Sequence, residues 1–111
     1  MELTTDRVGD VTVVVLRGDH LDASITDEFK RDIGPILEES PKVVFDMSQL
    51  QFVDSSGLGA ILSCLRRLGV SGGELKLSGM SKPVRAVFEI SRMHRIIDIF
   101  ATRDEALASF T

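Results

Sequence analysis

Short runs of β-branched and aliphatic residues alternate with segments of helical periodicity along this chain, and this alternation constrains its fold most. Val11–Arg17 is typical of a strand, and Lys42–Asp46 is nearly continuously apolar, as in a central parallel strand buried on both faces. Leu3–Arg7, followed by the turn signal Gly9-Asp10, predicts an antiparallel hairpin at the start. Strands that alternate with helices indicate a mostly parallel sheet. We therefore predict an α/β fold, with a mixed sheet of about five strands covered by about four helices, as one domain over residues 1–111.

The predicted helices are recognised by apolar spacing and by residues suited to their ends. Ser24 is expected to cap the first helix, and Gly34-Pro35 to kink it or break its last turn. The second helix is predicted from Ser55 or Ser56 to Leu68-Gly69, with Gly69 in the left-handed C-terminal position. The other elements are strands at Glu74–Ser78 and Ile96–Phe100, and helices opened by Ser81-Lys82-Pro83 and by the capping box Thr102-Arg103-Asp104-Glu105.

Charge and aromatic content argue against nucleic-acid binding. The formal net charge is −4, and Arg66-Arg67 is the only adjacent basic pair, whereas phosphate-backbone binding needs concentrated Lys and Arg. The chain has no Trp or Tyr, and its six Phe are expected in the core rather than stacked on bases. No nucleic-acid partner is expected.

The remaining composition favours a cytoplasmic protein without membrane insertion. No apolar run approaches the ~18–20 residues that span a bilayer, and the N-terminus lacks the regions of a signal peptide. Cys64 is the single cysteine, so no disulfide can form within the chain, and a buried thiol is expected there. His20 and His94 lack further ligands at metal spacing. We therefore expect no metal.

The segment Phe45–Leu62 carries the functional signal. A buried strand ends at Asp46 and a helix begins near Ser55, and sites in α/β sheets gather where strands end beside helix N-termini. Free N–H groups there can receive oxygen acceptors, including phosphate. Gly57 and Gly59 are expected to keep the first turn free of bulk, so that another protein can approach. Taken alone, the residues leave two interpretations open: a regulated serine, or an ordinary structural cap.

The motif Asp54-Ser55-Ser56-Gly57-Leu58-Gly59 resembles the signature of bacterial anti-sigma factor antagonists, which belong to the STAS domain family. The resemblance extends over nearly the whole chain, through Leu50-Gln51-Phe52-Val53, Ser81-Lys82-Pro83-Val84 and Arg95-Ile96-Ile97. It implies that Ser55 is the phosphorylated serine, and Ser56 is then expected to be the cap. It also implies a partner-binding face made by Asp22, Asp54, Ser56, Gly57, Leu58 and Gly59.

The resemblance implies partner switching rather than catalysis. The unphosphorylated protein would bind an anti-sigma factor that is also a serine kinase, and phosphorylation of Ser55 would release it. A serine phosphatase would reset the switch, and the protein would be a monomer or weak dimer. ATP would belong to the kinase, so this chain itself would need no cofactor. One departure affects partner specificity: the family commonly has Gly-x-Leu-Asp where this chain has the longer Gly18-Asp19-His20-Leu21-Asp22.

Three other interpretations stay open at this point. The same switch could regulate a target other than a sigma factor, or the chain could be a STAS subunit of a transport system. A hydrolase using Asp54, Ser55 and His94 is the third, but the G-x-S-x-G elbow and a glycine-rich phosphate loop are missing from the sequence.

Overall fold

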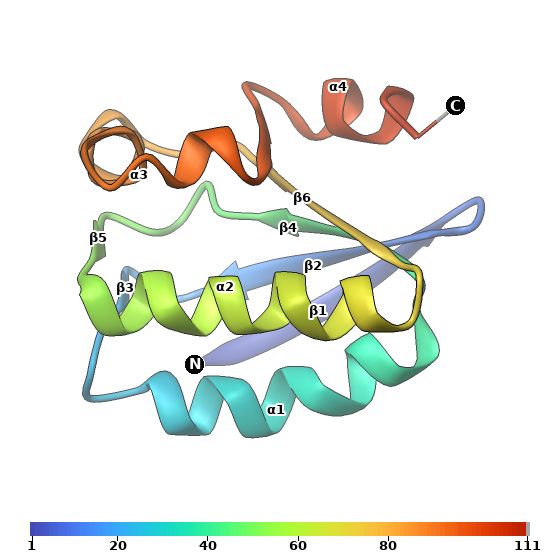
Figure 1. Cartoon of the computed structure of the whole chain (residues 1–111), viewed down its shortest axis with the longest axis horizontal. Coiled ribbons are helices and arrows are strands. Elements are labelled where there is room, and N and C mark those ends of the chain that lie inside the picture. Colours follow the sequence, from blue (N-terminus) through green and yellow to red (C-terminus); the bar gives the residue numbers. More distant parts are fainter. Residues whose placement is uncertain (111) are drawn as a thin grey trace.

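The computed structural model of the chain describes residues 1–110 and is drawn in Figure 1. Its elements, in chain order, are β1 (Glu2–Val8), β2 (Val11–Arg17), β3 (His20–Leu21), α1 (Thr26–Glu39), β4 (Lys42–Asp46), β5 (Phe52–Val53), α2 (Ser55–Val70), β6 (Glu74–Ser78), α3 (Lys82–Ile90), the 3-10 helix η1 (Met93–Arg95), β7 (Asp98–Phe100) and α4 (Arg103–Ala108).

The main sheet has five strands in the order β1-β2-β4-β6-β7. β1 pairs antiparallel with β2 and the other pairs are parallel, which confirms the predicted mixed α/β fold and its opening hairpin. Figure 1 shows α1 and α2 on one side of this sheet, with α3 and α4 on the other. The helical layers explain why β2 and β4 are mostly apolar, since both of their faces are covered.

Alternate residues of the central strands belong to different parts of the core. Val14 and Phe45 are fully buried in the larger cluster, which includes residues of α1 and α2. Val13 and Val44 are fully buried in a smaller cluster with Ala106 of α4. This alternation follows from the strand period of two, and it fixes the register of the strands, because a shift by one residue would exchange the two faces.

A second, two-stranded sheet lies at one end of the molecule. β3 pairs in parallel with β5, with His20 opposite Phe52 and Leu21 opposite Val53. The segment Met47–Val53, expected as a loop, therefore ends in a short strand. Two residues are too few to show a period of two, so the sequence pattern could not reveal this pairing.

The first helix corrects two expectations. It begins at Thr26 after Ile25, without a side-chain cap, because the Ser24 hydroxyl donates to Asp22 Oδ1 instead. It also continues through Pro35 to Glu39, so the broken last turn is wrong, while the alternative of a kink at Pro35 stays a prediction. Pro35 is exposed, so water can satisfy the carbonyl that loses its N–H partner, while buried Ile33 and Leu37 anchor the helix on both sides.

The other helix ends follow the sequence more closely. Ser81 and Thr102 cap α3 and α4, accepting from the N–H groups of Val84 and Glu105, as predicted. The expected left-handed Gly69 is wrong: α2 continues to Val70, and Gly72 takes the left-handed conformation with φ +81°. The last strand is shorter than predicted, because η1 precedes it.

Candidate functional site

The N-terminus of α2 lies at the end of the molecule opposite the β1–β2 turn, together with β3 and β5 (Figure 1). β2 begins at that turn, so α2 starts where β2 and its parallel neighbour β4 end. This placement confirms that the motif lies at the carboxyl ends of parallel strands, beside a helix N-terminus. Ser55 is the first residue of α2 and is exposed there.

Asp54 caps α2, and this corrects the expectation that Ser56 is the cap. Asp54 Oδ1 accepts a hydrogen bond from the Gly57 N–H at 2.9 Å, the bond that defines a side-chain N-cap. Within the described residues, the hydroxyls of Ser55 and Ser56 have no hydrogen-bond partner, and both residues are exposed. The N–H groups of Ser55 and Ser56 also lack partners within the helix, as is usual for its first turn. The helix start therefore presents free hydroxyls beside free N–H donors.

Asp54 also connects α2 to the loop before α1. Its Oδ2 accepts from the Ala23 N–H at 3.1 Å, so each carboxylate oxygen has a backbone donor. Asp22 directly precedes Ala23, and its Oδ1 accepts from the N–H and hydroxyl of Ser24. These hydrogen bonds hold the pKa of Asp22 below its ordinary value, and the bond from the Ser24 hydroxyl has the largest effect. Hydrogen bonds to Asp22 and Asp54 thus hold the short loop before α1 beside the N-terminus of α2.

The two glycines of the motif have different surroundings. Gly57 is buried, and a Cβ there would lie 2.1 Å from the carbonyl oxygen of Leu21 and 2.9 Å from Cγ1 of Val53. Gly59 is exposed, and a Cβ there would meet nothing within 4 Å. The expectation that Gly57 leaves room for another protein is therefore wrong. Its missing side chain lets α2 pack closely against β3. Gly59 leaves the outer surface open, and Leu58 is half-buried against the core.

The lengthened loop at residues 18–22 is ordered by backbone pairing. The carbonyl oxygen of Asp19 accepts from the N–H groups of Gln51 at 2.7 Å and Phe52 at 3.1 Å. Asp19 Oδ1 lies 2.7 Å from His20 Nδ1, and this hydrogen bond raises the pKa of His20. His20 thus lies on β3 opposite Phe52 of β5.

Phe52 is a candidate that sequence reasoning missed. The six phenylalanines were expected in the core, but the Phe52 side chain is 53% exposed, whereas neighbouring Val53 is buried. The only available signal was its position two residues before Asp54, in a segment expected as a loop. An exposed aromatic side chain beside the motif is well suited to a protein interface.

His94 and Cys64 have surroundings that differ from those of the motif. His94 Nδ1 lies 3.4 Å from the carbonyl oxygen of Phe88, and the Asp54 carboxylate is occupied by backbone donors, so these groups are not arranged as a triad with Ser55. Cys64 is only 3% exposed, and burial raises the pKa of its thiol to about 12. Among residues 1–110, no three His, Cys, Asp or Glu side chains gather in a way that could hold a metal ion.

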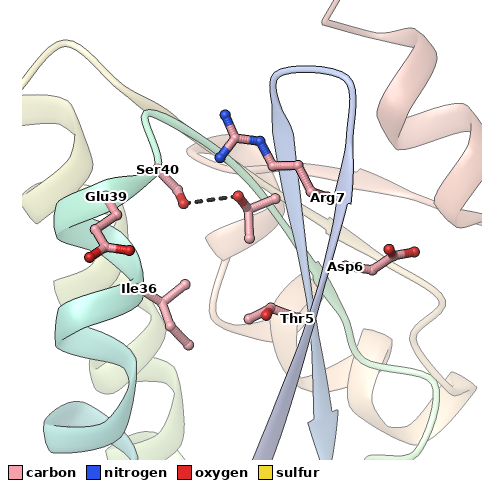
Figure 2. Close-up of a pocket in the computed structure, with 7 residues that line it drawn as sticks. Thr5, Asp6, Arg7, Ile36, Glu39 and Ser40 are labelled. Carbon is pink, nitrogen blue, oxygen red and sulfur yellow. Dashed lines mark hydrogen bonds between the residues drawn. The ribbon is translucent and has the colours of Figure 1, made fainter.

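One hollow of about 260 Å³ lies between the end of α1 and the β1–β2 hairpin (Figure 2). Thr12 Oγ1 and Ser40 Oγ are hydrogen-bonded across it at 2.9 Å. The β1–β2 turn and the end of α1 lie at the end of the molecule opposite the N-terminus of α2 in Figure 1, so this hollow is separate from the motif.

The comparisons with known proteins agree with this geometry. The family model described as STAS domain matches residues 2–106. The chain belongs to the STAS domain family. An anti-sigma F factor antagonist of Paenibacillus polymyxa is 29% identical over 99 residues, which cover 87% of this chain and 84% of that protein.

Two solved structures are similar to this chain. The Bacillus cell fate determinant SpoIIAA in its phosphorylated form is 25% identical, with a TM-score of 0.72, over 99% of this chain and all of that one. A sulfate transporter family protein of Wolinella succinogenes has a TM-score of 0.78 at 21% identity, over 92% of this chain and 85% of that one. The second likeness shows the fold alone. No helix in the described part of this STAS chain has the length and apolar character to cross a bilayer.

Proposed function

We propose that this STAS protein is an anti-sigma factor antagonist whose binding to an anti-sigma factor is switched off by phosphorylation of Ser55. The observation that carries the proposal is the division of roles at the start of α2. Asp54 caps the helix, whereas the Ser55 hydroxyl is exposed and makes no hydrogen bond within the described residues. A kinase can therefore reach Ser55 without removing a bond on which the fold depends.

The proposed partner face surrounds Ser55. Ser56 and Gly59 are exposed on the same end of α2, and half-buried Leu58 and Asp22 border them. Asp54 and Gly57 support this face from within, by capping the helix and by allowing it to pack against Leu21. The anti-sigma factor in this scheme is itself the serine kinase. It transfers the γ-phosphoryl group of ATP to Ser55 Oγ, releasing ADP and a proton, and a separate phosphatase hydrolyses the phosphate ester.

Phosphorylation is expected to act on the interface and not on the fold. A phosphoserine carries about −1.5 to −2 charges at neutral pH. At an exposed helix N-terminus the dipole favours that charge by roughly 0.3–1 kcal/mol, and the neighbouring Asp54 carboxylate opposes it. At a closely packed interface the same group must be desolvated or must push the partner away. A cost of even about 3 kcal/mol would lower affinity roughly a hundredfold.

The test is calorimetric titration of the candidate anti-sigma factor kinase with wild type, Ser55→Asp, Ser55→Ala and the matched control Ser56→Ala. Ser55→Asp should bind at least tenfold more weakly, and both alanine variants should bind like wild type. Thermal melts of all four should agree within a few degrees. Equal affinity of wild type and Ser55→Asp would remove Ser55 from the interface, and a phosphate placed on Ser56 by mass spectrometry would move the switch to that residue.

A further inference from the structure

A basic segment with exposed apolar side chains runs through α3 and η1, where α3 contacts β5 and lies on the other side of the main sheet from α2 (Figure 1). Residues 82–95 carry four cationic side chains, those of Lys82, Arg85, Arg92 and Arg95, against the single carboxylate of Glu89. Their formal charge is therefore +3. Because the whole chain carries −4, the remaining residues carry −7. Positive charge is thus concentrated on one segment of an acidic protein.

These four cations differ from most others in the structure. Elsewhere Lys42 is paired with Asp10 at 2.7 Å, and Arg67 with Glu38 at 2.8 Å. Within residues 1–110, the side chains of the four make no hydrogen bond or ion pair, and all four residues are exposed. Even Arg85 and Glu89, one helical turn apart, are not paired within 4 Å. Their charge is therefore available to a partner.

Two large apolar side chains are exposed in the same region. Ile90 is 84% exposed and Ile96 is 55% exposed. The inward face of α3 is already occupied by buried Val84 and Phe88, so Ile90 is not part of that face. Lys82, Ala86 and Ile90 follow at four-residue spacing and so form a single row along the solvent side of the helix. An apolar residue in a row beside cations is a feature of interaction surfaces.

Arg92 adds an independent observation. It follows the C-cap of α3 with φ +62°, and it is the only residue other than glycine with positive φ in the described chain. Glycine or asparagine is usual at this position, because a Cβ in the left-handed conformation costs free energy. Arg92 therefore holds a strained backbone conformation, and its side chain adds a positive charge two residues after Ile90. Residues held in such conformations are concentrated at functional sites.

A hollow of about 380 Å³ adjoins the segment at Ile96, which lines it together with Leu65 and Gly69. Glu74 and Asp98 also line it, and their carboxylates are 3.8 and 3.9 Å from Lys76 Nζ. That lysine offsets their charge. The hollow is large enough to receive an apolar side chain from a bound segment.

We propose that this surface binds an acidic segment of a partner protein, with an apolar side chain of that segment packed against Ile90 or Ile96. We call it the α3–η1 surface and define it by Lys82, Arg85, Ile90, Arg92, Arg95 and Ile96. A protein partner fits better than a lipid bilayer. The apolar face of α3 is committed to the core, and Ile90 and Ile96 are the only large apolar side chains exposed within the described residues 82–96. The other residues, at −7, would be repelled by anionic lipid. The proposal goes beyond the switch at Ser55 and stands without it.

The test uses NMR titration of the isotope-labelled full chain with a synthetic acidic peptide that contains two adjacent leucines. A control peptide has serines in place of the leucines. Amide shifts should be concentrated at the α3–η1 surface. Arg92→Glu/Arg95→Glu should weaken binding at least tenfold, and Ile90→Ser/Ile96→Ser should reduce the preference for the leucine peptide. The matched control is Lys30→Glu/Arg66→Glu, which reverses two exposed cations elsewhere and gives the same net charge of −8.

The control variant decides between a site and a general charge effect. If Lys30→Glu/Arg66→Glu weakens binding as much as the reversal at Arg92 and Arg95, the proposal is wrong. Stronger binding to vesicles of phosphatidylglycerol than to the peptide, lost in the Arg92 and Arg95 reversal, would assign the surface to lipid and overturn it. Self-association lost in the same variant would assign it to a second copy of the chain. If the reversal variant does not fold, Arg92→Gln/Arg95→Gln makes the same test.

Discussion

Replacing Gly57 with alanine tests whether the start of α2 is held by close backbone packing. The added Cβ would lie 2.1 Å from the carbonyl oxygen of Leu21, well inside van der Waals contact, so helix and strand would have to separate by about 1 Å. The obstacle is a backbone atom, which cannot turn away as a side chain can. The movement would also strain the bond from the Asp54 N–H to the same oxygen and the β3–β5 pairing.

The expected cost follows from two opposing effects. Overpacking of this kind costs about 1–3 kcal/mol, and the backbone contact favours the upper end of that range. Alanine gains about 0.5–1 kcal/mol over glycine within a helix. Gly57→Ala should therefore destabilise the fold by about 2 kcal/mol. At roughly 4 °C per kcal/mol for a domain of this size, its melting temperature should fall by about 8 °C.

Gly59→Ala is the matched control, because a Cβ there meets nothing within 4 Å and only the helical gain remains. Its melting temperature should rise by about 2–4 °C. The assay is thermal and urea unfolding of both variants, followed by circular dichroism. If both glycine variants shift in the same direction, or if Gly57→Ala melts like wild type, the contact with Leu21 does not constrain α2 and the packing argument fails.

Three further predictions concern side chains with defined partners. Asp54→Ala should lose about 1–2 kcal/mol of stability in urea unfolding, while Ser56→Ala should lose almost none, because Asp54 and not Ser56 caps α2; the reverse order would restore Ser56 as the cap. Cys64 should react with a thiol reagent at pH 8 far more slowly in the folded than in the unfolded chain, since burial raises its pKa to about 12, and equal rates would contradict its burial. Burial raises the pKa of Asp46, but hydrogen bonds from Ser48 and Arg103 outweigh it and leave the pKa below 3.8. The stability advantage of wild type over Asp46→Asn should therefore be present near pH 5 and narrow as the pH falls below 3.8. An advantage that does not change over that interval would show that the Asp46 carboxylate does not stabilise the fold through its charge.

The order of elements could be predicted because local signals agreed with one another. Val43–Phe45 is apolar since both faces of β4 are covered, and Ser81 and Thr102 lie where α3 and α4 need oxygen acceptors. Those signals depend on neighbouring residues alone. The short strands β3 and β5 depend on a pairing between residues about thirty positions apart, which no local pattern contains.

The motif was located by sequence, but the roles of its residues were not all assigned correctly. Ser56 and Asp54 are both good caps, and only the observed bond from Gly57 decides between them. Gly57 and Gly59 are identical in sequence terms, yet one contacts Leu21 and the other faces solvent. Phe52 was expected in the core, and its exposure follows from a pairing that leaves Val53 as the buried member of β5. The errors on Gly57 and Phe52 concern contacts between distant segments, whereas the choice of cap depends on a bond within one helical turn.

The separation of cap and exposed serine has a consequence for regulation. If Ser55 were the cap, a phosphate on its hydroxyl would alter the bond that begins α2, and modification would act first on stability. Because Asp54 holds the Gly57 N–H on one oxygen and the Ala23 N–H on the other, the helix start and the Asp22 loop stay connected whatever group Ser55 carries. Charge can then be added at the exposed first residue of α2 while the surrounding surface keeps its shape. A partner that binds this surface would respond to the added charge itself, which is the behaviour expected of a reversible switch.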